Sequence, residues 1–216
     1  MAIDKAHGVK ATYFFGMNQG LGLVYYPEDA KPFIELVQSN GFDAGVHGIV
    51  FDDFDGMKKE YDTWTQLMGT PPESIRMHYV RYDDKLFERL SRVGYAYDST
   101  EFHKPERKTI KTPYKVGNMW EFPLNIMEGY LVPKDEVIDD VSADTLKRAT
   151  LQIIDELKAQ DIHYLTILLH DPYYSFFYDG VRDWYQWLLQ YLSDNPDFDF
   201  VSYREAAALL EREANS

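Results

Sequence analysis

The feature that most constrains the fold is a regular alternation of short β-prone runs with longer amphipathic helical patterns. Strands are expected over residues 10–15, 43–47, 74–79, 95–99, 119–126, 163–170 and 198–201. Helices are expected over residues 27–40, 57–68, 84–93, 142–160, 179–192 and 203–212. Alternation at this spacing is typical of parallel βα units. We therefore predict an α/β fold, an irregular (β/α) barrel of about seven or eight strands, with residues 1–216 as one domain.

Composition narrows the classes of function. The formal net charge of −14 argues against binding nucleic acid or an anionic membrane as the main activity. Cysteine is absent, which excludes disulfides and thiolate metal sites. No apolar run approaches the roughly 20 residues of a membrane span, and no charged-then-apolar signal segment opens the chain. We expect a cytoplasmic protein.

Polar side chains of catalytic type follow several of the predicted strands. They are His47, Arg76, His78, Asp98 and His170. In (β/α) barrels the active site lies at the carboxyl ends of the strands, so these side chains are expected to converge on one rim. Each also has a simpler interpretation, as a structural histidine or as a surface ion pair.

The stretch from Gly45 to Asp55 contains His47 and, shortly afterwards, the adjacent carboxylates Asp52 and Asp53. Imidazole and carboxylate groups are ligands that Zn²⁺ accepts in proteins. The stretch is therefore a candidate metal site. The alternative is that its carboxylates form a solvated loop and cap the following helix.

Aromatic residues follow His170, with Tyr173 and Tyr174 first among them. One interpretation is a platform on which the apolar faces of sugar rings stack. The other is packing of the core and of a covering loop.

Several of these segments resemble motifs of the polysaccharide deacetylase family, in the family's order, between about residues 8 and 207. "GVKATYFF" is similar to its second strand, "DAGVHGIVFDD" to its metal motif and "LTILLHDPYY" to its last motif. "IRMHYVRYDDKLFERLSRVGYAYDST" is similar to its third and fourth motifs, and "MWEFPLNIME" to a Glu-Phe-Pro strand of one branch. The resemblance implies a distorted (β/α) barrel and metal-assisted hydrolysis of the N-acetyl group of a sugar.

The resemblance also implies roles for individual residues. His47 matches the first metal-binding histidine, whereas Phe51 stands where the second is expected. Asp52 or Asp53 could replace that ligand, and the implied cofactor is a divalent metal ion, usually zinc.

The remaining matches concern catalysis and substrate binding. Arg76 matches the arginine that orients a catalytic aspartate, Asp98 falls near the aspartate that supports the acidic histidine, and His170 matches that histidine, the general acid. His78 stands where the family's motif has proline, and it is predicted, with Tyr173 and Tyr174, to contact substrate.

The largest departure is at the N-terminus. The family's first strand carries paired aspartates, yet ten residues precede Ala11, fewer than a βα unit needs. The barrel is therefore expected to be incomplete or open at this strand. Three hypotheses follow: a deacetylase impaired by the missing motif, a non-catalytic carbohydrate-binding relative, or a subunit whose open edge a partner chain or another copy covers.

Overall fold

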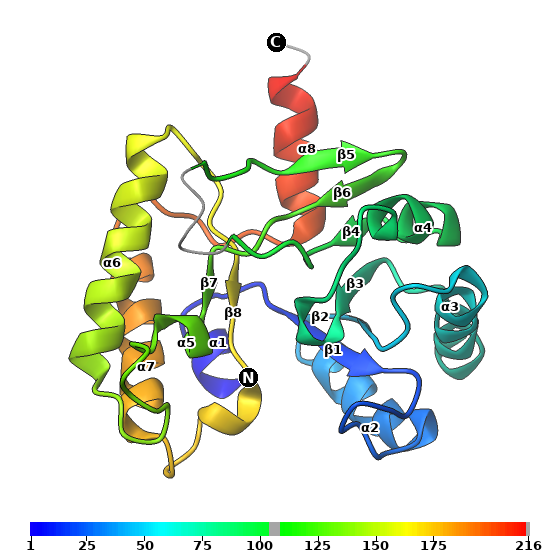
Figure 1. Ribbon diagram of the computed structural model, residues 1–216, viewed down its shortest axis with the longest axis horizontal. Helices are drawn as coiled ribbons and strands as arrows, with labels where there is room; N and C mark the ends of the chain where they lie inside the picture. The colour runs from blue at the N-terminus through cyan, green and yellow to red at the C-terminus, as the bar shows by residue number, and fades with distance from the viewer. Residues whose placement is uncertain (104–108, 215–216) are drawn as a thin grey trace.

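The strands of the protein form two sheets flanked by helices, as the computed structural model shows for residues 1–103 and 109–214, the residues it describes (Figure 1). The strands are β1 (Thr12–Gly16), β2 (Asp43–Gly48), β3 (Ser74–Met77), β4 (Tyr97–Asp98), β5 (Tyr114–Val116), β6 (Met119–Glu121), β7 (Ile126–Met127) and β8 (Ile167–Leu168). The α-helices are α1 (Ala2–Ala6), α2 (Pro27–Ser39), α3 (Phe54–Met68), α4 (Leu86–Val93), α5 (Glu128–Leu131), α6 (Ala143–Ala159), α7 (Asp179–Asp194) and α8 (Tyr203–Glu213).

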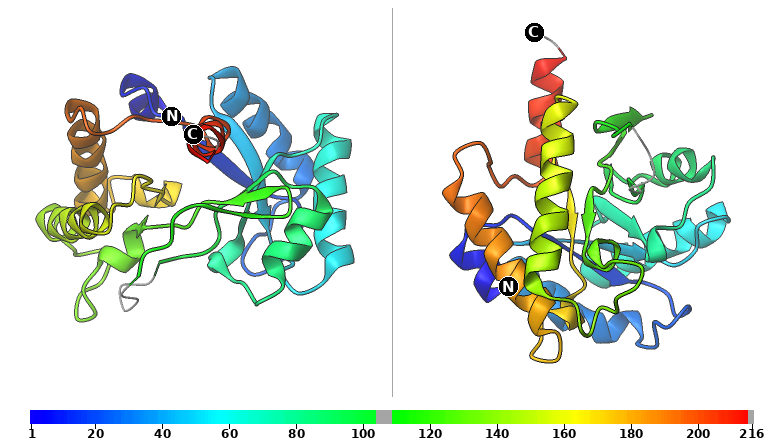
Figure 2. Two further views of the ribbon diagram at one scale, coloured as in Figure 1. Left: turned by 90° about the horizontal axis from the view of Figure 1, so that it is seen from above. Right: turned by 60° about the vertical axis from the view of Figure 1, so that its left-hand side comes forward.

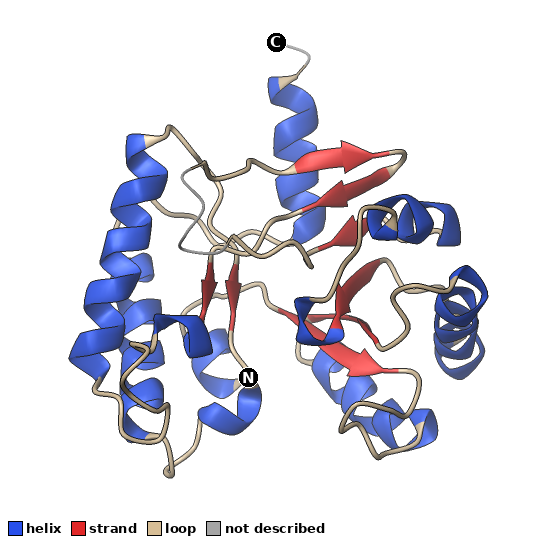
Figure 3. Cartoon of the chain, viewed as in Figure 1, coloured by secondary structure: helices blue, strands red, loops and turns tan. Residues whose placement is uncertain are grey.

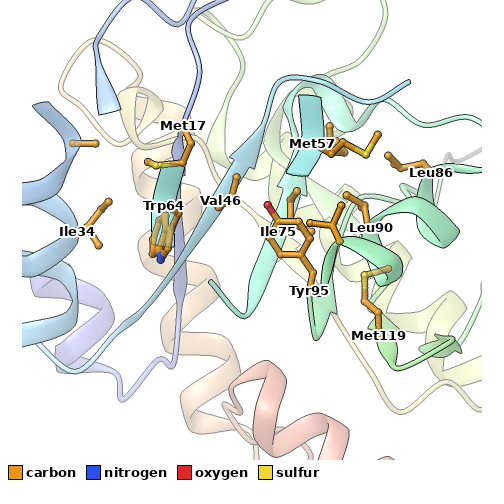
Figure 4. Packing of buried hydrophobic residues seen from close by; sticks show 13 residues of the cluster. Met17, Ile34, Val46, Met57, Trp64, Ile75, Leu86, Leu90, Tyr95 and Met119 are labelled. Atoms are coloured by element: carbon orange, nitrogen blue, oxygen red, sulfur yellow. The ribbon is translucent and has the colours of Figure 1, made fainter. Parts of the chain in front are cut away.

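The larger sheet has the order β1-β2-β3-β4-β6-β5. Its strands are parallel except β5, which returns antiparallel to β6 as a hairpin. Helices α2, α3 and α4 cover one face of it (Figure 3). The core between these layers contains Val46, Ile75, Trp64 and Leu90, all 2% exposed or less (Figure 4).

The smaller sheet consists of the parallel strands β7 and β8. A second apolar cluster packs against it from α6 and α7, around the fully buried Trp184, Leu188 and Leu146. The indole N–H of Trp184 donates to Thr150 on α6, which satisfies the one polar group of that side chain (2.8 Å). Each sheet therefore has its own helical cover and its own apolar core.

The barrel is not closed. Within residues 1–103 and 109–214, β1 pairs only with β2 and β8 only with β7. The short helix α1 lies beside this open side, near α7 (Figure 2). Its Asp4 is 5% exposed and accepts hydrogen bonds from Tyr13 on β1 (3.0 Å) and Tyr185 on α7 (2.7 Å). Burial alone would raise the pKa of Asp4, but hydrogen bonds, including those from Tyr185 and Tyr13, lower it.

We expect Asp4→Ala to lower the free energy of unfolding by about 2–4 kcal/mol, because two hydroxyl donors lose a charged acceptor. Urea unfolding followed by circular dichroism measures the change. Asp4→Asn keeps one carbonyl oxygen as an acceptor, so its free energy of unfolding should fall by less than that of Asp4→Ala. Equal stability of Asp4→Ala and the unmodified protein would show that this carboxylate does not stabilise the contact of β1 with α7.

The sequence predicted most elements but not all. The predicted strand 119–126 is divided between β6 and β7, and residues 198–201 form no strand. Helices α1 and α5 were missed, since each is too short to show a helical period. No helix in the described part of the chain combines the length and the apolar character that crossing a membrane requires.

Candidate active site at the strand ends

Three of the predicted histidines lie at or just beyond strand ends. His47 is the last residue but one of β2, and it is the register partner of Arg76 on β3. His78 follows β3 directly, and His170 lies two residues after β8. Gly45 lies two residues before His47 on β2. It approaches β3 so closely that a Cβ atom would lie 2.7 Å from the Ser74 carbonyl oxygen. The sequence therefore permits tight β2–β3 packing below the site.

His47 and His78 form a continuous chain of polar contacts. The Nδ1 of His47 lies 3.1 Å from the carbonyl oxygen of Arg76, and its Nε2 lies 2.8 Å from Nδ1 of His78. The Nε2 of His78 lies 2.9 Å from the carbonyl oxygen of Leu21. The two rings are nearly perpendicular, at 83°. Backbone carbonyl groups thus fix the orientation of both rings.

His47 is held in the neutral form. Burial, followed by the charges of His78, Arg76 and His170, lowers the pKa of His47 to about 3. The contribution of His170 means that this residue lies near enough to His47 to interact with it electrostatically. The structure therefore places His47, His78 and His170 in one region, although they come from three different strands.

His170 is paired with a carboxylate that sequence reasoning missed. Its Nδ1 forms a hydrogen bond with Oε1 of Glu128, the first residue of α5. The Glu128 side chain is 1% exposed, whereas that of His170 is 52% exposed. A buried carboxylate at Nδ1 fixes the ring and leaves Nε2 available to a ligand. Glu128 sits within the "MWEFPLNIME" segment, but only the strand pairing of β7 with β8 brings it beside His170.

The prediction that Asp98 supports the acidic histidine is wrong. Asp98 is fully buried on β4, where its Oδ1 accepts a hydrogen bond from the Thr100 hydroxyl (2.6 Å). Its register partner Glu121 is equally buried and accepts from the backbone N–H of Glu101 (2.8 Å). Burial, then the neighbouring Asp98, raises the pKa of Glu121 well above its usual value. Burial beside Asp98 therefore favours the protonated form of Glu121.

Arg76 is buried, and its guanidinium is held by neutral oxygen atoms. Its guanidinium donates to the carbonyl and hydroxyl oxygens of Ser99 (both 2.9 Å) and to the hydroxyl of Tyr203 (2.9 Å). It also lies over the ring of Phe14 on β1, 4.7 Å from the centroid. Arg76 therefore links β1, β3, the loop after β4 and α8. Its charge also acts on the buried Asp98, whose pKa is raised by burial and lowered by Arg76.

The predicted metal ligands Asp52 and Asp53 do not join His47. Asp53 caps α3, where its Oδ2 accepts from the N–H of Gly56 (2.8 Å), and Asp52 is exposed. Among residues 1–103 and 109–214, no group of three or more histidine, aspartate or glutamate residues is arranged to hold a metal ion. His47, Asp52 and Asp53 therefore do not form a zinc site in this arrangement. The alternative interpretation, a carboxylate that caps the following helix, describes Asp53.

Glu60, a further buried residue without a predicted role, shapes the segment after His47. Its carboxylate on α3 accepts hydrogen bonds from the N–H groups of Ile49 (3.1 Å) and Val50 (3.3 Å). Burial raises its pKa to about 7, against hydrogen bonds that lower it. Its helical position among apolar neighbours gave no signal of this contact. The carboxylate therefore holds the backbone directly after β2. In the same segment the Arg81 guanidinium lies over the ring of Phe51, 4.7 Å from its centroid.

The two predicted substrate-binding tyrosines differ in their surroundings. Tyr173 packs edge-to-face with His170, with 6.0 Å between ring centroids. Tyr174 instead packs on Tyr185 of α7, and its hydroxyl accepts from Gln186 (3.1 Å). Tyr173 is thus placed beside the candidate acid–base group, whereas Tyr174 has the contacts of a packing residue.

Comparison with known proteins gives no match at the level of sequence: no family model and no curated protein matches the chain. Solved structures do match. A candidate polysaccharide deacetylase from Mycobacterium smegmatis has a TM-score of 0.70 at 14% identity, over 99% of this chain and 76% of its own. One from Pseudomonas aeruginosa PAO1 has a TM-score of 0.67 at 14% identity, over 98% and 71%. Puue allantoinase has a TM-score of 0.65 at 14% identity, over 96% and 69%.

These likenesses confirm the predicted fold. The chain has the α/β architecture of the polysaccharide deacetylases, with a parallel sheet that does not close within the described residues. At 14% identity the likeness establishes the fold alone.

Proposed function

We propose that this chain binds an N-acetylated sugar at the strand-end rim and hydrolyses its acetamide bond slowly, with His170 as the acid–base group. The observation that carries the proposal is the pairing of a half-exposed histidine with a buried carboxylate, Glu128, at the end of β8. Tyr173 beside it offers an aromatic face to a sugar ring. The polysaccharide deacetylases named among the structural neighbours support a carbohydrate as the substrate class.

The chemistry requires one proton to move twice. The Glu128 carboxylate accepts the Nδ1–H of His170, so that the neutral ring presents the lone pair of Nε2. Nε2 can take a proton from water as the water oxygen bonds to the acetyl carbon. The same proton then passes to the sugar nitrogen as the C–N bond breaks, giving acetate and a free amine. Such a group typically contributes about 10²–10⁴-fold to the rate.

The resemblance implies a zinc ion, but the residues expected to hold it do not converge. We therefore assign no step of the reaction to a metal. Without an ion to polarise the acetyl carbonyl, hydrolysis is expected to be slow, since a bound metal contributes several kcal/mol of transition-state stabilisation in related chemistry.

A specific observation favours a second function, a non-catalytic carbohydrate-binding relative. Phe51 stands where the second metal-binding histidine is expected, and its ring packs against Arg81 and the core between the sheet and its helices. Loss of that ligand removes a catalytic element and leaves the rim and its aromatic residues intact.

Acetate release from N-acetylglucosamine oligosaccharides, together with their binding measured by calorimetry, separates the two functions. The proposal predicts saturable binding and slow acetate release. Binding without acetate release supports the second function. Absence of binding to both acetylated and deacetylated oligosaccharides contradicts each of them, and rapid zinc-dependent release contradicts the assignment of a slow, metal-independent reaction.

A further inference from the structure

Two exposed phenylalanines lie at the tip of the loop that follows His170. Phe176 and Phe177 are 72% and 71% exposed, and their ring centroids lie 4.0 Å apart. The two rings therefore form one continuous apolar face. Apolar residues scattered singly over a surface are ordinary, whereas contiguous apolar patches mark sites of interaction.

The base of this loop holds its tip beside the candidate site. Tyr173 packs on His170, and Tyr178 packs edge-to-face on Tyr173 with 4.9 Å between ring centroids. The N–H of Tyr178 donates to the carbonyl oxygen of Ser175 (3.2 Å), which closes the turn. Three residues of chain span at most about 11 Å, so the Cα atom of Phe176 lies within that distance of the Cα atom of Tyr173. The loop joins the carboxyl end of β8 to α7 (Figure 1).

The loop exposes its purely apolar rings and keeps its hydroxyl-bearing rings partly buried. Tyr173, Tyr174 and Tyr178 are all partly buried, whereas both phenylalanines are exposed. Packing alone favours the opposite arrangement, because phenylalanine is fully buried more often than tyrosine and has no polar group to present to water. The arrangement therefore indicates a partner that is apolar where it meets Phe176 and Phe177.

We propose that Phe176 and Phe177 bind the alkyl chain of an amphipathic substrate, an N-acetylated sugar that carries such a chain on its anomeric carbon. This inference rests on the proposed function, because the sugar has to lie at His170 for its chain to reach the loop tip. Tyr173, between the histidine and the tip, then lies beside the sugar ring. Burial of the chain is non-directional, so it requires no polar contact at the tip.

Charge and area argue against two other partners. Asp171, Asp179 and Asp183 flank the tip in sequence, and Arg182 pairs with both Asp179 (2.7 Å) and Asp183 (2.9 Å). Anionic lipid surfaces attract segments rich in lysine and arginine, so they repel this one. Two phenylalanines bury at most about 500 Å², less than the roughly 800 Å² per partner of a stable protein interface. A single alkyl chain matches the size of the pair.

The test is isothermal calorimetry with the octyl and the methyl β-glycosides of N-acetylglucosamine, below the concentration at which the octyl glycoside forms micelles. We expect the octyl glycoside to bind about 10–100-fold more tightly, because several methylene groups leave water. In the double variant Phe176→Ser/Phe177→Ser its affinity should fall to that of the methyl glycoside, and Phe177→Ser alone should lose part of the preference. Phe33→Ser is the matched control and should keep it, since Phe33 is also exposed (60%) but lies on α2.

Circular dichroism establishes that each variant is folded. An octyl preference that survives the double substitution overturns the proposal. Equal binding of the two glycosides also overturns it and leaves the proposed function standing, whereas no binding of either glycoside removes both. Without an octyl preference, binding to phosphatidylcholine vesicles or dimers on a sizing column, lost in the double variant, would assign the pair to a lipid surface or to a second copy.

Discussion

His170→Ala is expected to lower the rate of acetate release from an acetylated oligosaccharide by about 10²–10⁴-fold, the usual contribution of a positioned acid–base group. His170 has the half-exposed ring that such a role requires, and the Glu128 carboxylate fixes it. Alanine removes both the proton acceptor of the first step and the proton donor of the second. Binding of the oligosaccharide should change much less than the rate.

Glu128→Gln tests the same dyad without removing the histidine. The amide oxygen can still accept from Nδ1, so the ring stays in place while the negative charge is lost. We expect a smaller loss of rate than in His170→Ala, because the ring keeps its hydrogen-bond acceptor and loses only the negative charge beside it. His163→Ala serves as the control, since that ring is exposed and belongs to no part of the site. An unchanged rate in His170→Ala would remove His170 from the mechanism.

The second large effect concerns stability. Glu121→Ala is expected to lower the free energy of unfolding by about 3–5 kcal/mol, because it removes a hydrogen-bonding partner from the buried Asp98. It also removes the acceptor of the Thr100 and Glu101 N–H groups. Glu121→Gln is the matched variant, since its amide oxygen can accept from those N–H groups while its NH₂ donates to Asp98. At low pH, the free energy of unfolding of Glu121→Gln should remain close to that of the unmodified protein.

The pair also predicts the direction of a pH dependence. Burial raises the pKa of both carboxyl groups, so the folded protein retains a proton that the unfolded chain has released above about pH 4–5. Stability contributed by that proton is complete at lower pH and is lost as the pH rises through the folded-state values. Between pH 5 and 8, Glu121→Gln should therefore gain stability relative to the unmodified protein. If the free energy of unfolding of Glu121→Gln and of the unmodified protein varied with pH in the same way, Glu121 would be ionised in the folded protein.

The sequence was most informative where a side chain and its backbone element belong to the same segment. The strand ends at His47 and His170 were visible because each histidine follows an apolar run, and the alternation of strands and helices predicted the parallel sheet. Glu128 could not be predicted as the partner of His170, because 42 residues separate them and only the β7–β8 pairing joins them. The resemblance assigned that role to Asp98, whose carboxylate instead accepts a hydrogen bond from Thr100.

The metal ligands show the same limit. Proximity in sequence suggested Asp52 and Asp53 as partners of His47, whereas the helix N-terminus takes Asp53 as its cap. The nearest imidazole comes from His78, 31 residues away, through the β2–β3 register. Contacts across parallel strands depend on register, which sequence periodicity alone does not give.

Chemical-shift mapping with an N-acetylglucosamine tetramer tests the central claim most directly, since it asks which end of the sheet receives a sugar. The account predicts that the largest changes occur at His170, Tyr173 and the residues around His47, at the carboxyl ends of the strands. A separate cavity at the opposite ends of the strands is lined by Glu73, Tyr97 and Arg204 among others. Changes confined to those residues, or no changes at all, would contradict a carbohydrate site at the strand-end rim.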